Sequence, residues 1–232
     1  MYTQHIIVDL EMNPVDRNFR DAAKLLINET IEIGAVKVND KFEIVDKFDC
    51  FVNPEYNSHI ERRIVKLTGI KTCDVAKALS FKDALSAFES WVGYNDKTRV
   101  YSWSDTDLLQ IQRECSFKNI DFPQNLKRWM DFQAVYQRLM KLSSGKRRVS
   151  LKDAAGAYSI LMDKNRVHNG LYDAEVTAEL VIPVLNGEFK RQLECMDKYS
   201  YRSESTSDSI GDLCGGILAD LLKEMNCSEA SA

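Results

Sequence analysis

The first sixty residues carry short apolar runs that are typical of β-strands. His5–Glu11 is β-branched and ends in polar residues, Glu29–Val38 alternates in part, and Lys41–Val52 follows the turn-prone pair Asn39-Asp40. Such a pair between two alternating runs favours a hairpin. We therefore predict three adjacent strands at the start of the chain.

Helical periods then replace the strand pattern. We predict helices over Ser58–Leu67, Phe81–Val92, Asp107–Cys115, Leu126–Leu142 (helical at least from Phe132), Leu151–Ile160 and Asp173–Leu185, and short strands over Arg99–Trp103 and around Trp129. Ser80 and Ser150 stand at N-cap positions. Strands followed by alternating helices and strands indicate an α/β fold, a mixed central β-sheet flanked by helices.

The composition changes after Lys198. Tyr199–Asp208 is rich in serine and charge, and apolar residues then recur at helical spacing from Ile210 to Met225. We predict a main domain over residues 1–196, a Ser-rich linker over 197–209, and a C-terminal amphipathic helix and tail over 210–232. That helix could fold back on the domain, mediate a homodimer or dock on another partner.

The charge balance narrows the classes of function. The chain has 232 residues, with 31 Lys plus Arg against 35 Asp plus Glu, a net charge of −4. This excludes a long basic surface that grips duplex nucleic acid through its phosphates. No segment approaches the roughly 20 apolar residues that span a bilayer. Residues Met1–Leu10 lack the basic and apolar regions of a signal peptide, and the cysteines are scattered. We therefore expect no membrane partner and a cytoplasmic location.

Three polar motifs carry candidate chemistry. Asp9 and Glu11 share one face of a strand, and two such carboxylates are unfavourable together unless cations bind them. A further acid, Asp105 or Asp107, follows a strand end. His168 precedes a helix that Asp173 opens. Each motif alone has an ordinary explanation, namely a solvated strand end, a helix cap or a surface histidine.

In this order, the motifs resemble the DEDDh family of 3′–5′ exonucleases, the superfamily of RNase T and the DNA polymerase III proofreading subunit. The likeness spans about residues 5–186 and includes Glu29–Val36, the segment Leu67–Ile70 and Ser150–Ala154. Trp103 ahead of the second acid is most similar to the subgroup of histone-mRNA and small-interfering-RNA trimming and sporulation-inhibitor-like exonucleases. The resemblance implies a ribonuclease H-like fold and makes residues 1–196 an exonuclease domain.

The resemblance also implies a role for each residue of the motifs. Asp9 would bridge two divalent cations, Glu11 and Asp173 would help hold one of them, and Asp107 would hold the other. His168 would deprotonate the attacking water, as an imidazole that titrates near neutral pH can. Hard oxygen ligands suit Mg²⁺ or Mn²⁺, whereas the scarcity of histidine and of clustered cysteine argues against zinc.

Substrate contacts are less defined by the sequence. Leu10 and Met12 are candidate substrate-binding residues, although core packing explains Met12 equally well. The chain departs from the family after Glu11, where Met12-Asn13-Pro14 leads into a polar insert that ends at Asn28.

The sequence thus predicts a metal-dependent 3′–5′ exonuclease that removes nucleoside monophosphates from the 3′ end of single-stranded nucleic acid. The subgroup likeness favours RNA, but the distinction depends on contacts to the 2′-hydroxyl that the sequence does not reveal. Two alternatives stay open, a DNA-directed proofreading subunit and a non-catalytic binding module on the same fold.

Overall fold

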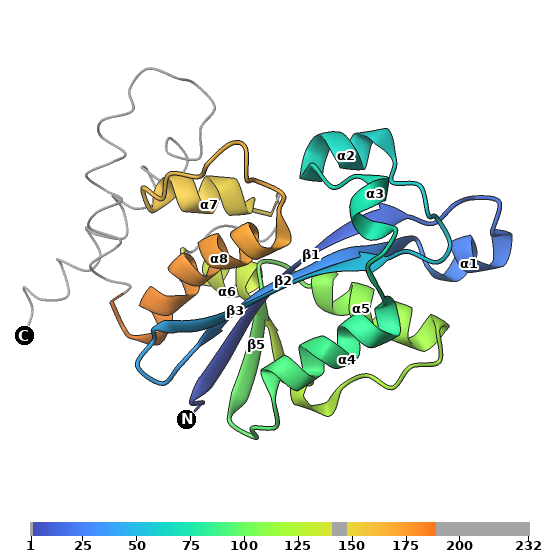
Figure 1. Cartoon of the computed structure of the whole chain (residues 1–232). Helices are drawn as coiled ribbons and strands as arrows, with labels where there is room; N and C mark the ends of the chain where they lie inside the picture. Colours follow the sequence, from blue (N-terminus) through green and yellow to red (C-terminus); the bar gives the residue numbers. More distant parts are fainter. Residues whose placement is uncertain (1, 141–147, 189–232) are drawn as a thin grey trace, which may run out of the picture. The chain divides into compact units, whose positions relative to one another are not determined.

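The computed structural model describes residues 2–140 and 148–188 (Figure 1). These residues fall into two compact units, the first made of 2–131 with 164–178, and the second of 132–140 with 148–163 and 179–188. The predicted linker over 197–209 and the C-terminal helix over 210–232 lie outside the described residues. Among the described helices, none has the length and apolar character needed to span a membrane.

A six-stranded sheet forms the centre of the first unit. The strands are β1 (Gln4–Pro14), β2 (Asn28–Val38), β3 (Ile44–Asn53), β4 (Leu79–Ser80), β5 (Thr98–Ser102) and β6 (Trp129–Asp131). Their order is β4-β3-β2-β1-β5-β6, so β1 lies in the interior between β2 and β5. β1 is antiparallel to β2 and parallel to β5. The predicted mixed sheet is confirmed, as is the hairpin of β2 and β3.

Helices surround this sheet. Those of the first unit are α1 (Arg20–Leu25), α2 (Arg62–Thr68), α3 (Thr72–Val75), α4 (Phe81–Val92), α5 (Thr106–Phe117) and the start of α8 (Gly170–Leu185), with a 3₁₀ turn at Gln124–Leu126. The second unit contains α6 (Phe132–Leu139), α7 (Leu151–Ala157) and the end of α8.

Several helices differ from the sequence prediction. α1, inside the polar insert, and α3 were not expected. α2 begins at Arg62 instead of Ser58. α8 begins at Gly170, three residues before the predicted start at Asp173. The reason is a local cap, because the Asn169 side-chain oxygen accepts the backbone N–H of Tyr172 at 3.0 Å. Asp173 therefore lies within the first turn of α8.

The hydrophobic core determines which face of β1 carries the acids. Val8 and Leu10 are buried in one cluster with Phe88 of α4 and Ile111 of α5, which lie on the same side of the sheet (Figure 1). Successive residues of a strand point to opposite faces. The core therefore leaves the neighbouring acids of β1 on the other face.

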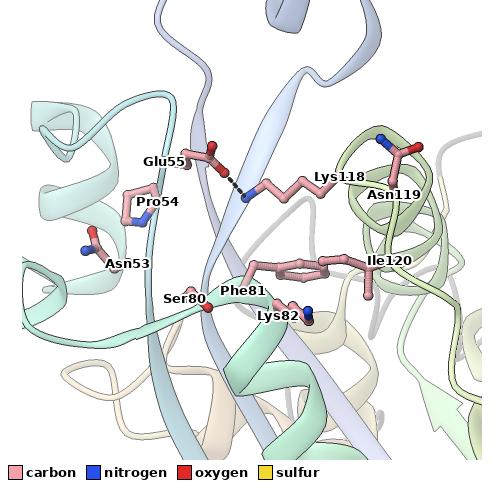
Figure 2. A pocket seen from close by; sticks show the side chains of 9 residues that line it. All are labelled: Asn53, Pro54, Glu55, Ser80, Phe81, Lys82, Lys118, Asn119 and Ile120. Carbon is pink, nitrogen blue, oxygen red and sulfur yellow. Dashed lines mark ion pairs between the residues drawn. The ribbon is translucent and has the colours of Figure 1, made fainter.

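A buried ion network joins β2 to α5 and to the loop after β3. Lys118 lies 3.0 Å from Glu29 and 2.9 Å from Glu114, and both carboxylates are fully buried. Figure 2 shows Lys118 directed toward Glu55 as well, at 3.7 Å. Burial lowers the pKa of Lys118, but Glu114 and Glu29 raise it above its ordinary value. One ammonium thus pairs with two buried acids.

Replacing Lys118 with methionine should destabilise the fold strongly. The change leaves Glu29 and Glu114 buried without their cation, which costs about 3–5 kcal/mol of unfolding free energy. Urea denaturation followed by tryptophan fluorescence measures the loss.

Lys24→Met is the matched control, because its pair with Asp21 is largely exposed. This variant should lose at most about 1 kcal/mol. Equal losses in the two variants would contradict the role assigned to the buried network.

Candidate active site

The carboxyl end of β1 projects beyond its parallel neighbour. Pairing with β5 ends at Ile7, opposite Tyr101, so Asp9 and Glu11 lie past the last paired residue. In this stretch the backbone N–H of Leu10 donates to Asp107 Oδ1 at 3.1 Å. The hydrogen bond holds the first turn of α5 against β1, and it brings the predicted second acid to the first motif.

The third motif reaches the same place from the far end of the chain. Ligand atoms of Glu11, His168 and Asp173 lie within 4.8 Å of one another. Glu11 and Asp173 are buried, whereas His168 is accessible to solvent. Asp9 interacts electrostatically with Glu11, Asp107 and Asp173. The structure therefore brings together the five residues that the sequence singled out.

The loop that carries His168 has an unusual backbone. His168 adopts a left-handed conformation with φ of 65°, which costs a non-glycine residue free energy unless its surroundings hold it there. Its N–H donates to Asp173 Oδ2 at 3.1 Å. Asp173 thus helps fix the residue that precedes its own helix.

This loop packs directly on the backbone of the sheet. A Cβ atom at Gly34 of β2 would lie 2.0 Å from the carbonyl carbon of Gly170 and from the nitrogen of Leu171. A Cβ at Gly170 would meet the carbonyl oxygen of Asp9 at 3.1 Å. No other residue type than glycine fits at Gly34 without displacing the loop.

Sequence reasoning missed one acid of this site, Glu32. It is fully buried on β2, in register with Glu11 of β1. Its carboxylate accepts hydrogen bonds from the Asn169 side chain at 2.8 Å and from the Gly170 N–H at 3.0 Å. The available signal was an acid between two isoleucines of a predicted strand, but sequence alone does not show that β2 places it beside Glu11.

The electrostatics of the site follow from burial and like charge. Burial raises the pKa of Glu11 to about 9, and the nearby Glu32, Asp173 and Asp107 add to this effect. Burial likewise raises the pKa of Asp107 to about 7, although the Leu10 N–H opposes it. The pKa values of Asp9 and Asp173 are also raised, mainly by burial.

The donor set fits divalent cations. Asp173 Oδ1 is buried and has no hydrogen-bond partner among the described residues, although a buried carboxylate oxygen normally requires one. Around it the site offers mainly carboxylate oxygens, the donors that suit Mg²⁺ and Mn²⁺, beside the single imidazole of His168. A cation would satisfy this oxygen and offset the repulsion between the acids.

The two candidate substrate-binding residues have their side chains in or against the core. Leu10 is buried in the cluster beneath β1, and Met12, which follows a β-bulge, packs against the same cluster. Their contact with a substrate stays a prediction.

A separate cavity of 430 Å³ lies elsewhere in the first unit, and Figure 2 shows it. Phe81, Lys118 and Glu55 are among its lining residues, which include none of the five predicted active-site residues. We assign it no chemistry.

Comparison with models of protein families shows which family the chain belongs to. The exonuclease model of the RNase T family matches residues 6–181, most of the chain. The chain belongs to the RNase T exonuclease family. The membership predicted from the motifs is therefore confirmed.

The chain is similar in sequence to known exonucleases at 26–27% identity. The 3′-5′ exoribonuclease 1 of Rattus norvegicus is 26% identical over 195 residues, which cover 79% of this chain and 53% of that protein. The ERI1 exoribonuclease 2 of Xenopus laevis is 27% identical over 201 residues, 77% of this chain and 28% of that protein. The chain thus spans about half of the first relative's length and less of the second.

Solved exonuclease structures share the fold. The nuclease domain of 3′hExo, a DEDDh family member bound to rAMP, has a TM-score of 0.69 at 23% identity, over 80% of this chain and 93% of that one. E. coli exonuclease I with a dT13 oligonucleotide has a TM-score of 0.62 at 14% identity, over 86% of this chain and 43% of that one. The ribonuclease H-like fold implied by the resemblance is confirmed.

Chelation of divalent cations should make the stability of the protein depend on pH. The pKa of Glu11 is about 9 and that of Asp107 about 7 in the folded protein, whereas unfolded carboxyls titrate near pH 4. The folded state then binds more protons, so the free energy of unfolding falls as pH rises from about 4 to about 9. In EDTA we expect a lower Tm at about pH 8 than at about pH 6.

Differential scanning fluorimetry measures this Tm. Mg²⁺ should raise the Tm more at the higher pH, because the deprotonated acids then bind the cation without first losing protons. Glu11→Gln should flatten the pH dependence in EDTA. A Tm in EDTA that rises with pH over this range would contradict the shared burial of the acids.

Proposed function

We propose that this chain is a 3′–5′ exonuclease that releases nucleoside monophosphates from the 3′ end of single-stranded RNA. The observation that carries the proposal is the convergence of four acids, Asp9, Glu11, Asp107 and Asp173, with His168 at the carboxyl end of β1. The free thiols of the described part fit the cytoplasmic location expected from the sequence.

The acids would hold two divalent cations, Mg²⁺ or Mn²⁺. Asp9 would contact both, Glu11 and Asp173 would contact one, and Asp107 the other. The unpartnered Asp173 Oδ1 supports cation binding by Asp173. Bound cations would neutralise the scissile phosphate and the leaving oxygen, and would make water easier to deprotonate.

His168 would act as the general base. A water attacks the phosphorus of the last phosphodiester while the imidazole takes its proton, and the bond from phosphorus to the 3′-oxygen of the preceding nucleotide breaks. The 3′-oxygen takes a proton from solvent, and the product is a nucleoside 5′-monophosphate. His168 is accessible to solvent, so its proton can leave after each cycle.

The relatives support RNA as the substrate. Those at 26–27% identity are named exoribonucleases, and one structural neighbour is a 3′-exonuclease that recognises the 3′ end of a histone mRNA stem-loop. Exonuclease I bound to dT13 has the same fold, so the fold alone does not distinguish RNA from DNA. Recognition of the 2′-hydroxyl would make that distinction.

Matched RNA and DNA single strands test the proposal. With a 5′ label and Mg²⁺, we expect the RNA to shorten stepwise from its 3′ end and to release mononucleotides faster than the DNA, and a strand blocked by a 3′-phosphate serves as the control. Preference for DNA would overturn the substrate assignment alone. Absence of Mg²⁺-dependent release from either strand would overturn the enzymatic function.

Substitution of His168 should remove most hydrolysis and leave cation binding largely intact. Loss of a general base costs about 10²–10⁴-fold in rate. His168→Ala and His168→Asn should both show this loss under single-turnover conditions, and asparagine tolerates the left-handed backbone better than alanine. The Mg²⁺-induced rise in Tm should persist. Mononucleotide release at the wild-type rate from either variant would exclude His168 as the base.

A further inference from the structure

The family motifs leave the fifth acid of the site, Glu32, without a role. It is fully buried on β2, and burial raises its pKa to about 7, opposed by the Gly170 N–H and reinforced by Asp49. A buried carboxyl beside Glu11 and Asp173 adds repulsion to a site already rich in like charge. An apolar side chain would fill the same strand position without this cost.

Both oxygens of the Glu32 carboxylate accept hydrogen bonds from the residues that follow His168, and Asp49 of β3 also lies within hydrogen-bonding reach of Glu32. Asn169 Nδ2 donates to one carboxylate oxygen at 2.8 Å, and the Gly170 N–H donates to the other at 3.0 Å. Asn169 and Gly170 directly follow His168 in the chain. Glu32 therefore holds the two residues next to the base without touching the base itself.

The loop needs such an anchor for two reasons. His168 is in the left-handed region at φ of 65°, a conformation that persists only when the surroundings enforce it. Gly170 also rests against the backbone of β2 at Gly34. Bonds between a carboxylate and N–H donors are stronger than neutral ones, so both oxygens of Glu32 oppose relaxation of this loop.

We propose that Glu32 is a positioning residue, which holds the Asn169–Gly170 backbone against β2 and thereby keeps the His168 imidazole in place for proton transfer. The inference rests on the proposed function in one respect, the role of His168 as base. A base displaced by about 1 Å can lose on the order of 10²-fold in rate. Glu32 thus acts on kcat through His168 rather than on substrate or cation binding.

A double-mutant cycle separates this role from a general effect on the fold. Glu32→Gln keeps the size of the side chain but presents an amide N–H₂ where one loop donor now binds. We expect kcat for mononucleotide release to fall by about 10- to 100-fold with little change in KM. In the His168→Asn background the same substitution should cost nothing further, because its effect passes through the imidazole.

Glu29→Gln is the matched control. Glu29 is an equally buried glutamate of β2, and it accepts the backbone N–H groups of Glu55 and Tyr56 at 2.9 and 2.7 Å, on a loop that does not carry the base. This variant should lower Tm but leave kcat per folded molecule unchanged. A wild-type kcat in Glu32→Gln, or an equal loss in both His168 backgrounds, would overturn the proposal.

NMR spectroscopy tests the positioning role of Glu32 independently of activity. An inactive wild-type protein would refute the proposed function, but the effect of Glu32 on the His168 imidazole could still be measured. The chain has three histidines, so the imidazole NMR signals of His168 can be assigned by substitution. We expect these signals to shift or broaden in Glu32→Gln and to stay unchanged in Glu29→Gln. Unchanged His168 signals in Glu32→Gln would show that Glu32 does not position the loop.

Discussion

Repulsion among the carboxyl groups at the end of β1 is the constraint that the rest of the first unit has to accommodate. Asp9 interacts unfavourably with four other acids, from β1, β2, α5 and α8. Three of those acids each accept a backbone N–H from a different segment, namely Asp107 from Leu10, Asp173 from His168 and Glu32 from Gly170. The acids that repel one another therefore also hold the segments of the site together.

β2 shows two ways of burying a glutamate. Near its start, Glu29 lies 3.0 Å from the Lys118 ammonium, and the charge is neutralised within the chain. Three residues later, Glu32 has hydrogen-bond donors and other acids around it, and no pairing cation among the described residues. The first arrangement contains a cation supplied by the chain, whereas the second does not. That difference within one strand separates structural acids from those that need a cation from outside.

Much of the fold could be predicted from local sequence. The β-branched run of β1, the partial alternation of β2 and the Ser80 cap of α4, whose hydroxyl accepts the Asp83 N–H, depend on neighbours within a few residues. The start of α8 was misplaced because Asn169 and Asp173 are both good capping residues, and only the packing of the loop on β2 selects between them. The site residues could be predicted because the three motifs occur in the order of the family. Glu32 was not predicted because its place beside Glu11 depends on the pairing register of β1 and β2, which local sequence does not determine.

The contact of Gly34 with Gly170 links the motion of the site to that of the sheet. Most active-site loops rest on side chains, which can change rotamer and let the loop open while the core stays folded. Here the loop lies on the backbone of β2 without an intervening side chain, and β2 pairs along almost its whole length with β1. Displacement of this segment therefore uncovers the backbone of β2 itself and breaks the bond from the Gly170 N–H to Glu32. The same close contact that excludes a side chain at position 34 should protect the Gly170 amide from hydrogen exchange.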